Sequence, residues 1–212
     1  MKALATIFIV DDDASVRTAL TRLLSARNFN VESFSSAREF LARTPIEGNC
    51  CLLLDLAMPE MNGLELQSEL AARQRKIPVV FLTGHGDIAS GVEAMKHGAV
   101  DFLTKPVDEE ALFASLTSAL EKSREFAAQR RADEEMQHRF DTLTAREREV
   151  MQLVVAGLLN KQIAAQLGIS EKTVKVHRAR VMEKTDSPSL AALVRLCAAA
   201  QEGVSGADGQ FD

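Results

Sequence analysis

The stretch Thr6-Ile-Phe-Ile-Val-Asp-Asp-Asp13 decides the fold of the first half of this chain. It joins a short apolar run to three consecutive aspartates, and a second apolar run, Cys51-Leu-Leu-Leu54, ends in the same way at Asp55. Short runs that are apolar on both faces are typical of buried strands in a parallel sheet. Because parallel strands end at one edge of the sheet, we expect the acidic ends to converge there.

Similar apolar runs alternate with segments of helical period through residues 1–120. We expect strands at residues 6–10, 29–34, 51–54, 78–82 and 100–103, and helices at residues 14–27, 37–43, 63–74, 87–97 and from 108. Strands that alternate with helices predict an α/β domain built on a doubly wound, five-stranded parallel sheet.

The second half differs in composition. Residues 121–139 are highly charged and hold no Gly or Pro, which predicts a solvated helical linker continuous with the fifth helix. Whether this linker transmits a signal or only holds two domains apart stays open. Residues 140–202 predict an all-α domain of four short helices, in which residues 160–179 form two helices around a turn at Gly168, with Asn160 as a helix cap. The tail, residues 203–212, is expected to be disordered.

Composition limits the class of protein. The net charge is -5, yet the segment 160–184 holds six basic and two acidic residues, a weak indication of nucleic-acid binding. We found no apolar run of about 18 residues and no cleavable leader, so a cytoplasmic protein without a membrane partner is expected. Three cysteines are too few and too irregular for a disulfide framework or a zinc site.

Four predicted strand ends carry polar residues. Asp11 and Asp12 follow the first strand, Asp55 the third, Thr83 ends the fourth, and Lys105 follows the fifth. Clustered carboxylates repel each other, and a divalent cation such as Mg²⁺ removes that cost. The alternative for Asp11–Asp13 is that they only cap the first helix.

This set of residues suits phosphoryl transfer. Asp55 is a carboxylate nucleophile, and Mg²⁺ held by Asp12 and Asp55, with Asp11 through water, neutralises the phosphoryl oxygens. Lys105 adds a second positive charge. The hydroxyl of Thr83 can bond the phosphoryl group once it is in place, which gives the protein two states.

With Met58-Pro59, Gly63, Thr83-Gly84-His85-Gly86 and Lys105-Pro106, these residues resemble the receiver domain of two-component response regulators, a flavodoxin-like fold. The resemblance implies phosphorylation of Asp55 by a sensor histidine kinase and adds the carbonyl of Ala57 to the metal ligands. It also implies a cis Lys105-Pro106 bond and a switch role for Phe102, which could equally be a core residue.

The segment 140–202 resembles the LuxR-type helix-turn-helix of FixJ- and NarL-like regulators. The matching stretches are Leu143-Thr-Ala-Arg-Glu147, Gly157-Leu158 with Asn160-Lys161, and Thr173-Val-Lys-Val-His-Arg178. The resemblance implies that Lys175 and Val176 contact bases and that Lys161, Thr173 and Arg178 contact phosphates. The basic run could also be a solvated helix face. Thr185 departs from the family, which usually has a large apolar residue there.

We therefore expect a phosphorylation-dependent transcription regulator, not an enzyme. It would dimerise when phosphorylated, bind promoter DNA and contact RNA polymerase. One rival is a phosphohydrolase with an Asp nucleophile, but the second acid that such enzymes carry is replaced here by Ala57. Another is a DNA-binding protein whose receiver no longer needs phosphate.

Overall fold

The computed structural model describes residues 5–43, 48–84 and 94–205, with side chains as far as residue 200. The chain divides into two compact units, residues 1–128 and residues 129–212, each described here by itself. Residues 206–212 of the predicted tail, and His85 and Gly86 of the receiver motif, lie outside the described residues. Of the helix expected at residues 87–97, only residues 94–96 are described as helical.

The first unit is built on a five-stranded sheet in the order β2-β1-β3-β4-β5. Every strand pairs in parallel with its neighbours, which confirms the doubly wound α/β prediction. The strands are β1 (Thr6–Val10), β2 (Asn30–Phe34), β3 (Cys50–Asp55), β4 (Val79–Thr83) and β5 (Asp101–Thr104). β1, β3 and β4 are almost wholly buried, as expected for runs that are apolar on both faces.

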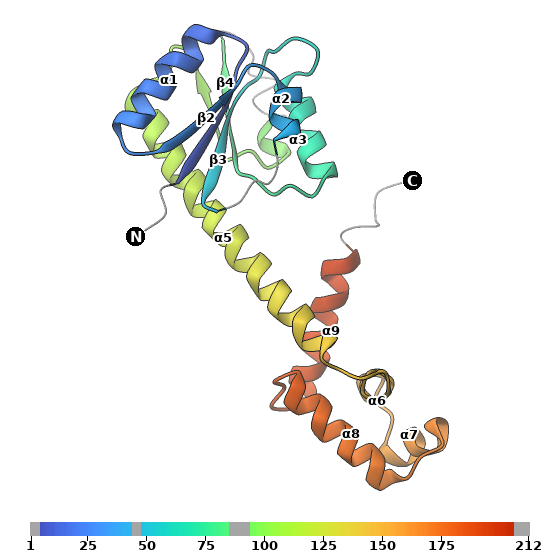
Figure 1. Ribbon diagram of the computed structural model, residues 1–212. Helices are drawn as coiled ribbons and strands as arrows, with labels where there is room; N and C mark the ends of the chain where they lie inside the picture. The colour runs from blue at the N-terminus through green and yellow to red at the C-terminus, as the bar shows by residue number, and fades with distance from the viewer. Residues whose placement is uncertain (1–4, 44–47, 85–93, 206–212) are drawn as a thin grey trace. The chain divides into compact units, whose positions relative to one another are not determined.

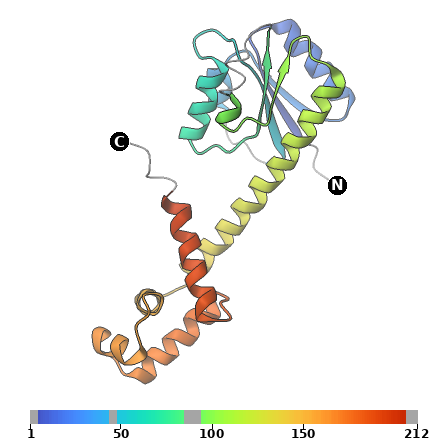
Figure 2. The same cartoon turned by 180° about the vertical axis from the view of Figure 1, so that it is seen from behind.

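Helices cover both faces of this sheet (Figures 1 and 2). One face is covered by α1 (Ala14–Ala26) and the start of α5 (Glu109–Asp141), and the other by α2 (Ala37–Ala42) and α3 (Gly63–Ala72). Each face has its own apolar core. Because side chains alternate along a strand, Cys50 of β3 packs in the core beneath α2 and α3, whereas Cys51 packs in the core beneath α1 and α5.

Helix α5 continues without a break from Glu109 to Asp141, as the charged composition of residues 121–139 predicted. Its buried residues end at Ser123, whose hydroxyl accepts a hydrogen bond from the backbone N–H of Cys50. Beyond that point the helix is stabilised along its own surface, for example by Gln129 bonding Asp133 one turn later.

The described part of the second unit holds four more helices: α6 (Ala145–Val155), α7 (Asn160–Leu167), α8 (Glu171–Lys184) and α9 (Leu190–Ser205). Val150, Ile163, Val174 and Leu193 are fully buried in its core. Helix α9 continues to Ser205, three residues into the tail expected to be disordered from residue 203, because Gln201 and Glu202 continue an alanine-rich, helix-favouring stretch. Among the described residues, no helix has the length and apolar character needed to cross a membrane.

Candidate functional site

Three carboxylates converge at the carboxyl edge of the sheet. Asp11 follows β1 directly, Asp55 is the last residue of β3, and ligand oxygens of Asp11, Asp12 and Asp55 lie within 4.8 Å of one another. Asp11 is 0% exposed and Asp55 is 5% exposed, whereas Asp12 is exposed. The convergence predicted from the strand order is therefore present.

Lys105 joins this cluster from the end of β5. Its Nζ lies 2.6 Å from Asp11 Oδ2 and 2.9 Å from Asp55 Oδ2. The backbone N–H of Lys105 donates to the carbonyl of Thr83, with an N···O distance of 2.6 Å, and the following Lys105–Pro106 bond is cis, as expected. Thr83 ends β4 and is buried, and its hydroxyl donates locally to the carbonyl of Gly84 at 3.1 Å.

Two buried carboxylates thus share one ammonium group. Burial raises the pKa of Asp55 above its ordinary value, although the bond from Lys105 opposes that shift. Burial alone would lower the pKa of Lys105, but its bonds to Asp11 and Asp55 outweigh this and raise it. With Asp12 close by, the cluster has an excess of negative charge and an all-oxygen donor set, which fits a hard divalent cation.

The aspartate run divides between two tasks. Asp13 caps α1, where its Oδ1 accepts from the backbone N–H of Ser15 at 2.7 Å, and the Ser15 bonds lower its pKa. Asp13 therefore caps the helix, whereas Asp11 and Asp12 lie with Asp55 in the carboxylate cluster. The carbonyl of Asp11 is held by Arg17 Nη1 at 2.8 Å, which sequence reasoning missed because local spacing does not reveal it.

The loop after β3 is held close beneath Asp55. The N–H of Ala57 donates to Asp55 Oδ1 at 3.3 Å, and the N–H of Gly63 donates to the carbonyl of Leu56 at 3.0 Å. A Cβ on Gly63 would lie 2.5 Å from the carbonyl oxygen of Asp55, so only glycine fits there. Phe102 is half-buried against the core beneath α2 and α3, a position compatible with either the switch or the core interpretation.

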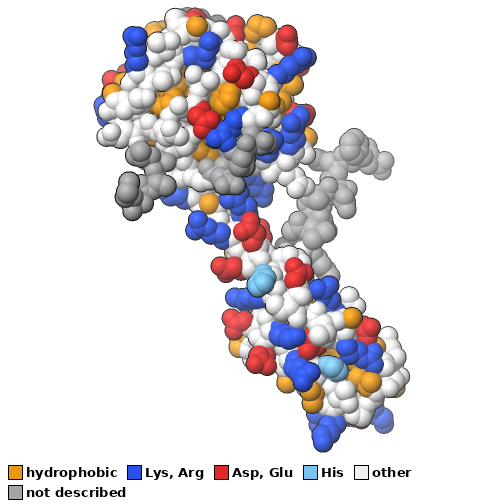
Figure 3. All heavy atoms as spheres, viewed as in Figure 1, with side chains coloured by type: hydrophobic (Ala, Val, Ile, Leu, Met, Phe, Trp, Pro, Cys, Tyr) orange, Lys and Arg blue, Asp and Glu red, His pale blue; other side chains and the backbone are white. Residues whose placement is uncertain are grey.

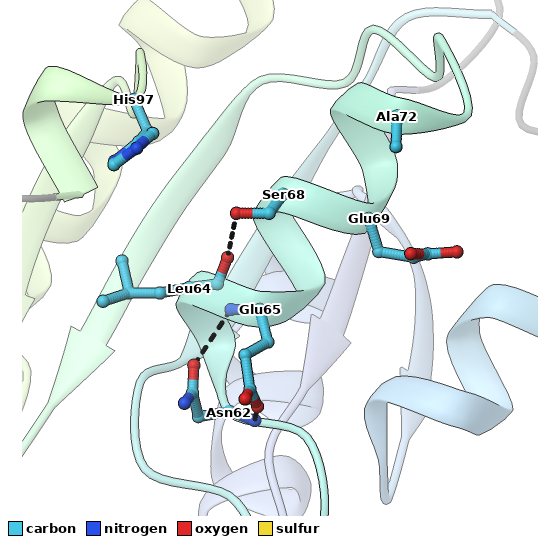
Figure 4. Close-up of a pocket in the computed structure, with 7 residues that line it drawn as sticks. All are labelled: Asn62, Leu64, Glu65, Ser68, Glu69, Ala72 and His97. Carbon is cyan, nitrogen blue, oxygen red and sulfur yellow. Dashed lines mark hydrogen bonds between the residues drawn. The ribbon is translucent and has the colours of Figure 1, made fainter. Parts of the chain in front are cut away.

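A separate hollow lies beside α3 (Figure 4). It is lined by Asn62, Leu64, Glu65, Ser68, Glu69, Ala72 and His97. In the close-up, Asn62 accepts from the backbone N–H of Glu65, and Ser68 donates to the carbonyl of Leu64. These bonds belong to the helix itself, and none of the clustered carboxylates lines this hollow.

The second unit contains the predicted helix-turn-helix in α7 and α8. Gly168 ends α7 in the left-handed conformation, with φ of 66°, and Ser170 caps α8 by accepting from the N–H of Thr173 at 3.1 Å. Lys161, Lys175 and Val176 are exposed, and Thr173 is half-buried. Figure 3 shows Lys and Arg side chains on the visible surface of this unit.

One helix-cap prediction is wrong. The residue before α7 is Leu159, and Asn160 is the first helical residue. The Asn160 side chain instead accepts a hydrogen bond from Arg178 Nη1 of α8 at 2.7 Å. A cap preference is local, whereas this partner lies 18 residues away.

A partly buried ion pair links the start of α6 to the end of α8. Lys184 Nζ lies 2.7 Å from Glu147 Oε2 and also donates to the carbonyl of Thr142 at 3.0 Å. Glu147 also completes a capping box with Thr144, and its pairing with Lys184 was not predicted from the sequence. Thr185, the departure from the family pattern, is fully buried and donates its hydroxyl to the carbonyl of Val181 at 2.7 Å.

Comparisons with known proteins match both units. Residues 7–117 match the family described as "Response regulator receiver domain", and residues 141–197 match "Bacterial regulatory proteins, luxR family". Nodulation protein W of Bradyrhizobium diazoefficiens is 45% identical over 192 residues, covering 91% of this chain and 85% of that protein. Transcriptional regulatory protein FixJ of Rhizobium meliloti is 44% identical over 202 residues, covering 94% and 98%. The solved structure of response regulator StyR is 47% identical with a TM-score of 0.76, covering 93% of this chain and 100% of that one.

Proposed function

This chain belongs to the FixJ family of response-regulator transcription factors, and from that premise we propose that a phosphoryl group on Asp55 controls its binding to promoter DNA. The observation that carries the proposal is the convergence of Asp11, Asp12 and Asp55 within 4.8 Å, with Lys105 bonded to two of them. Because the members of this family are transcription regulators, the family match also argues against the phosphohydrolase interpretation.

Asp55 acts as the nucleophile. One of its carboxylate oxygens forms a bond to phosphorus while the bond between phosphorus and a histidine nitrogen of the sensor kinase breaks. Lys105 then releases a carboxylate and places its charge on the phosphoryl oxygens. Asp11, Asp12, Asp55 and the carbonyl of Ala57 would hold Mg²⁺, which supplies further positive charge to the same oxygens.

The response to phosphorylation involves β4 and β5. The Thr83 hydroxyl, now bonded to Gly84, turns to donate to the phosphoryl group, and Phe102 follows into the space beside it. This gives the receiver two arrangements whose balance the phosphoryl group shifts.

The DNA contacts are assigned to the helix-turn-helix. Lys175 and Val176 are exposed on α8, the second helix of the motif, and meet base edges, while Lys161 and Thr173 meet phosphates. Leu190 and Val194 of α9 are exposed apolar residues that fit a contact between two copies on a two-fold DNA site. In that complex the regulator contacts RNA polymerase.

The test is labelling by a small phosphodonor with Mg²⁺, followed by measurement of DNA affinity and oligomeric state. Wild type and the matched control Asp13→Asn should be labelled, because Asp13 only caps α1, whereas Asp55→Asn should stay at background. Equal labelling of Asp55→Asn contradicts the assignment of the acceptor. Labelling that changes neither DNA affinity nor oligomeric state contradicts the switch and favours a receiver that no longer needs phosphate.

A further inference from the structure

Arg178 lies on the packed side of α8. It follows Val174 by four residues and precedes Val181 by three, and residues at these spacings share one face of a helix. The two valines are 0% and 2% exposed, whereas Lys175 and Val176 are exposed. Arg178 itself is half-buried. Its side chain therefore starts from the border of the core side of α8, between the buried valines and Lys175 and far from Val176.

The guanidinium group has a specific partner on the neighbouring helix. Arg178 Nη1 donates to Asn160 Oδ1 at 2.7 Å, and Asn160 is the half-buried first residue of α7. A hydrogen bond from a charged donor is stronger than a neutral one, and partial burial protects it from water. The bond ties the second helix of the motif to the start of the first.

The other end of α7 is held in a similar way. Arg146 of α6 donates from Nη2 to the carbonyl of Leu167, the last residue of α7, at 2.5 Å. Helix α7 has only eight residues, of which Ile163 and Ala164 are buried. With so small a buried face, the direction of α7 depends on these contacts at its two ends.

We propose that Arg178 is a positioning residue that acts through Asn160 to fix α7 relative to α8. This role replaces the phosphate contact that the family resemblance implies for Arg178, and it rests on the DNA-binding function proposed above. The first helix of such a motif crosses the DNA backbone while the second enters the major groove, so a wrong angle between them weakens binding to the specific site.

A double-mutant cycle on the full chain tests the proposal, with phosphodonor and Mg²⁺ present throughout. The probes are a duplex that the wild-type protein enriches from a random-sequence library and a scrambled duplex of equal length. Arg178→Ala and Asn160→Ala should each weaken binding to the enriched duplex by about tenfold. In the Asn160→Ala background, Arg178→Ala should cause no further loss and should leave the salt dependence of binding unchanged.

A phosphate contact gives a different result. Arg178→Ala would then weaken binding in both backgrounds and would reduce the slope of log affinity against log salt by about 0.9 each time. That result overturns the proposal. The control Lys161→Ala should show this slope change, because Lys161 is assigned to a phosphate.

Loss of folding must be distinguished from loss of positioning. Binding is therefore measured well below the unfolding temperature of each variant, and far-UV circular dichroism gives that temperature. Glu147→Gln is the matched control, because it loses a partly buried ion pair between α6 and α8 of the same unit. It should unfold at a lower temperature yet bind within about twofold of wild type. If Arg178→Ala likewise unfolds at a lower temperature but binds DNA within about twofold of wild type, the proposal is overturned. Failure of the wild-type protein to enrich any duplex contradicts the proposed function, and the inference falls with it.

Discussion

Asp55 in the first unit and Glu147 in the second are both buried carboxylates bonded to a lysine, yet their pKa values shift in opposite directions. Burial raises the pKa of Asp55, whereas the bond from Lys184 and the N–H of Thr144 lower the pKa of Glu147 to about 2. Asp55 shares Lys105 with Asp11, whereas Lys184 and the N–H of Thr144 both donate to Glu147 and stabilise its ionised form.

The two carboxylates show how a functional site differs from a structural ion pair. Glu147 is compensated within the protein, so its charge stabilises the junction of α6 and α8. The charge around Asp55 is only partly compensated, so that edge of the sheet gains by receiving a cation or a phosphoryl group with its metal. A cluster of buried carboxylates thus indicates a functional site where the carboxylates outnumber the neighbouring positively charged side chains.

The largest effect is expected at Gly63, which supports the Asp55 edge. Gly63→Ala would place a Cβ 2.5 Å from the Asp55 carbonyl oxygen and 3.1 Å from Leu56 Cα, so backbone must move. We expect the receiver to lose about 3 kcal/mol of its free energy of unfolding. Hydrogen exchange read by mass spectrometry at β3 and α3 measures this. Gly84→Ala is the control, because no atom of the described residues lies within 4 Å of a Cβ built there, and an equal loss in both variants would contradict the steric explanation.

A smaller loss of stability is expected when the Glu147–Lys184 ion pair is removed. Glu147→Gln should cost the second unit about 2 kcal/mol, because a charged, partly buried bond to Lys184 is lost. Since the pKa of Glu147 is lowered, its contribution is complete above about pH 4.5 and is lost as the pH falls towards about 2. Wild-type exchange at α6 and α8 should accelerate over that range more than in Glu147→Gln. Parallel pH profiles in the two proteins would refute the ionised pair.

The smallest effect has the opposite sign. Asp55→Asn should stabilise the receiver at pH 7 by about 1 kcal/mol, because a carboxylate with a raised pKa pays for ionisation in the folded protein. The gain should shrink as the pH falls below the raised pKa, where the wild-type carboxyl is protonated. Exchange at β1 and β3 in metal-free buffer gives the difference. If Asp55→Asn instead destabilised the receiver at pH 7, the proposed difference between the two carboxylates, one costing stability and the other adding it, would be contradicted.

The sequence predicted the sheet and the convergence of Asp11, Asp12 and Asp55 because both follow from apolar patterns and from the direction of parallel strands. It could not predict that Lys184 meets Glu147 or that Arg178 meets Asn160, because those contacts depend on how helices pack across many residues. One clue was available for Arg178: its spacing from Val174 and Val181 places it on the buried side of α8. The cap assigned to Asn160 failed because a distant partner competed with a local preference.

The neighbouring residues Cys50 and Cys51 of β3 point into the two different cores of the receiver. Burial raises the pKa of the Cys51 thiol, so it resists alkylation while its layer stays closed. Because the chain has no Trp or Tyr that could serve as an optical probe, the reactivity of these two thiols can be measured instead. Each reports on a different layer, so loosening beneath α2 and α3 can be timed separately from loosening beneath α1 and α5.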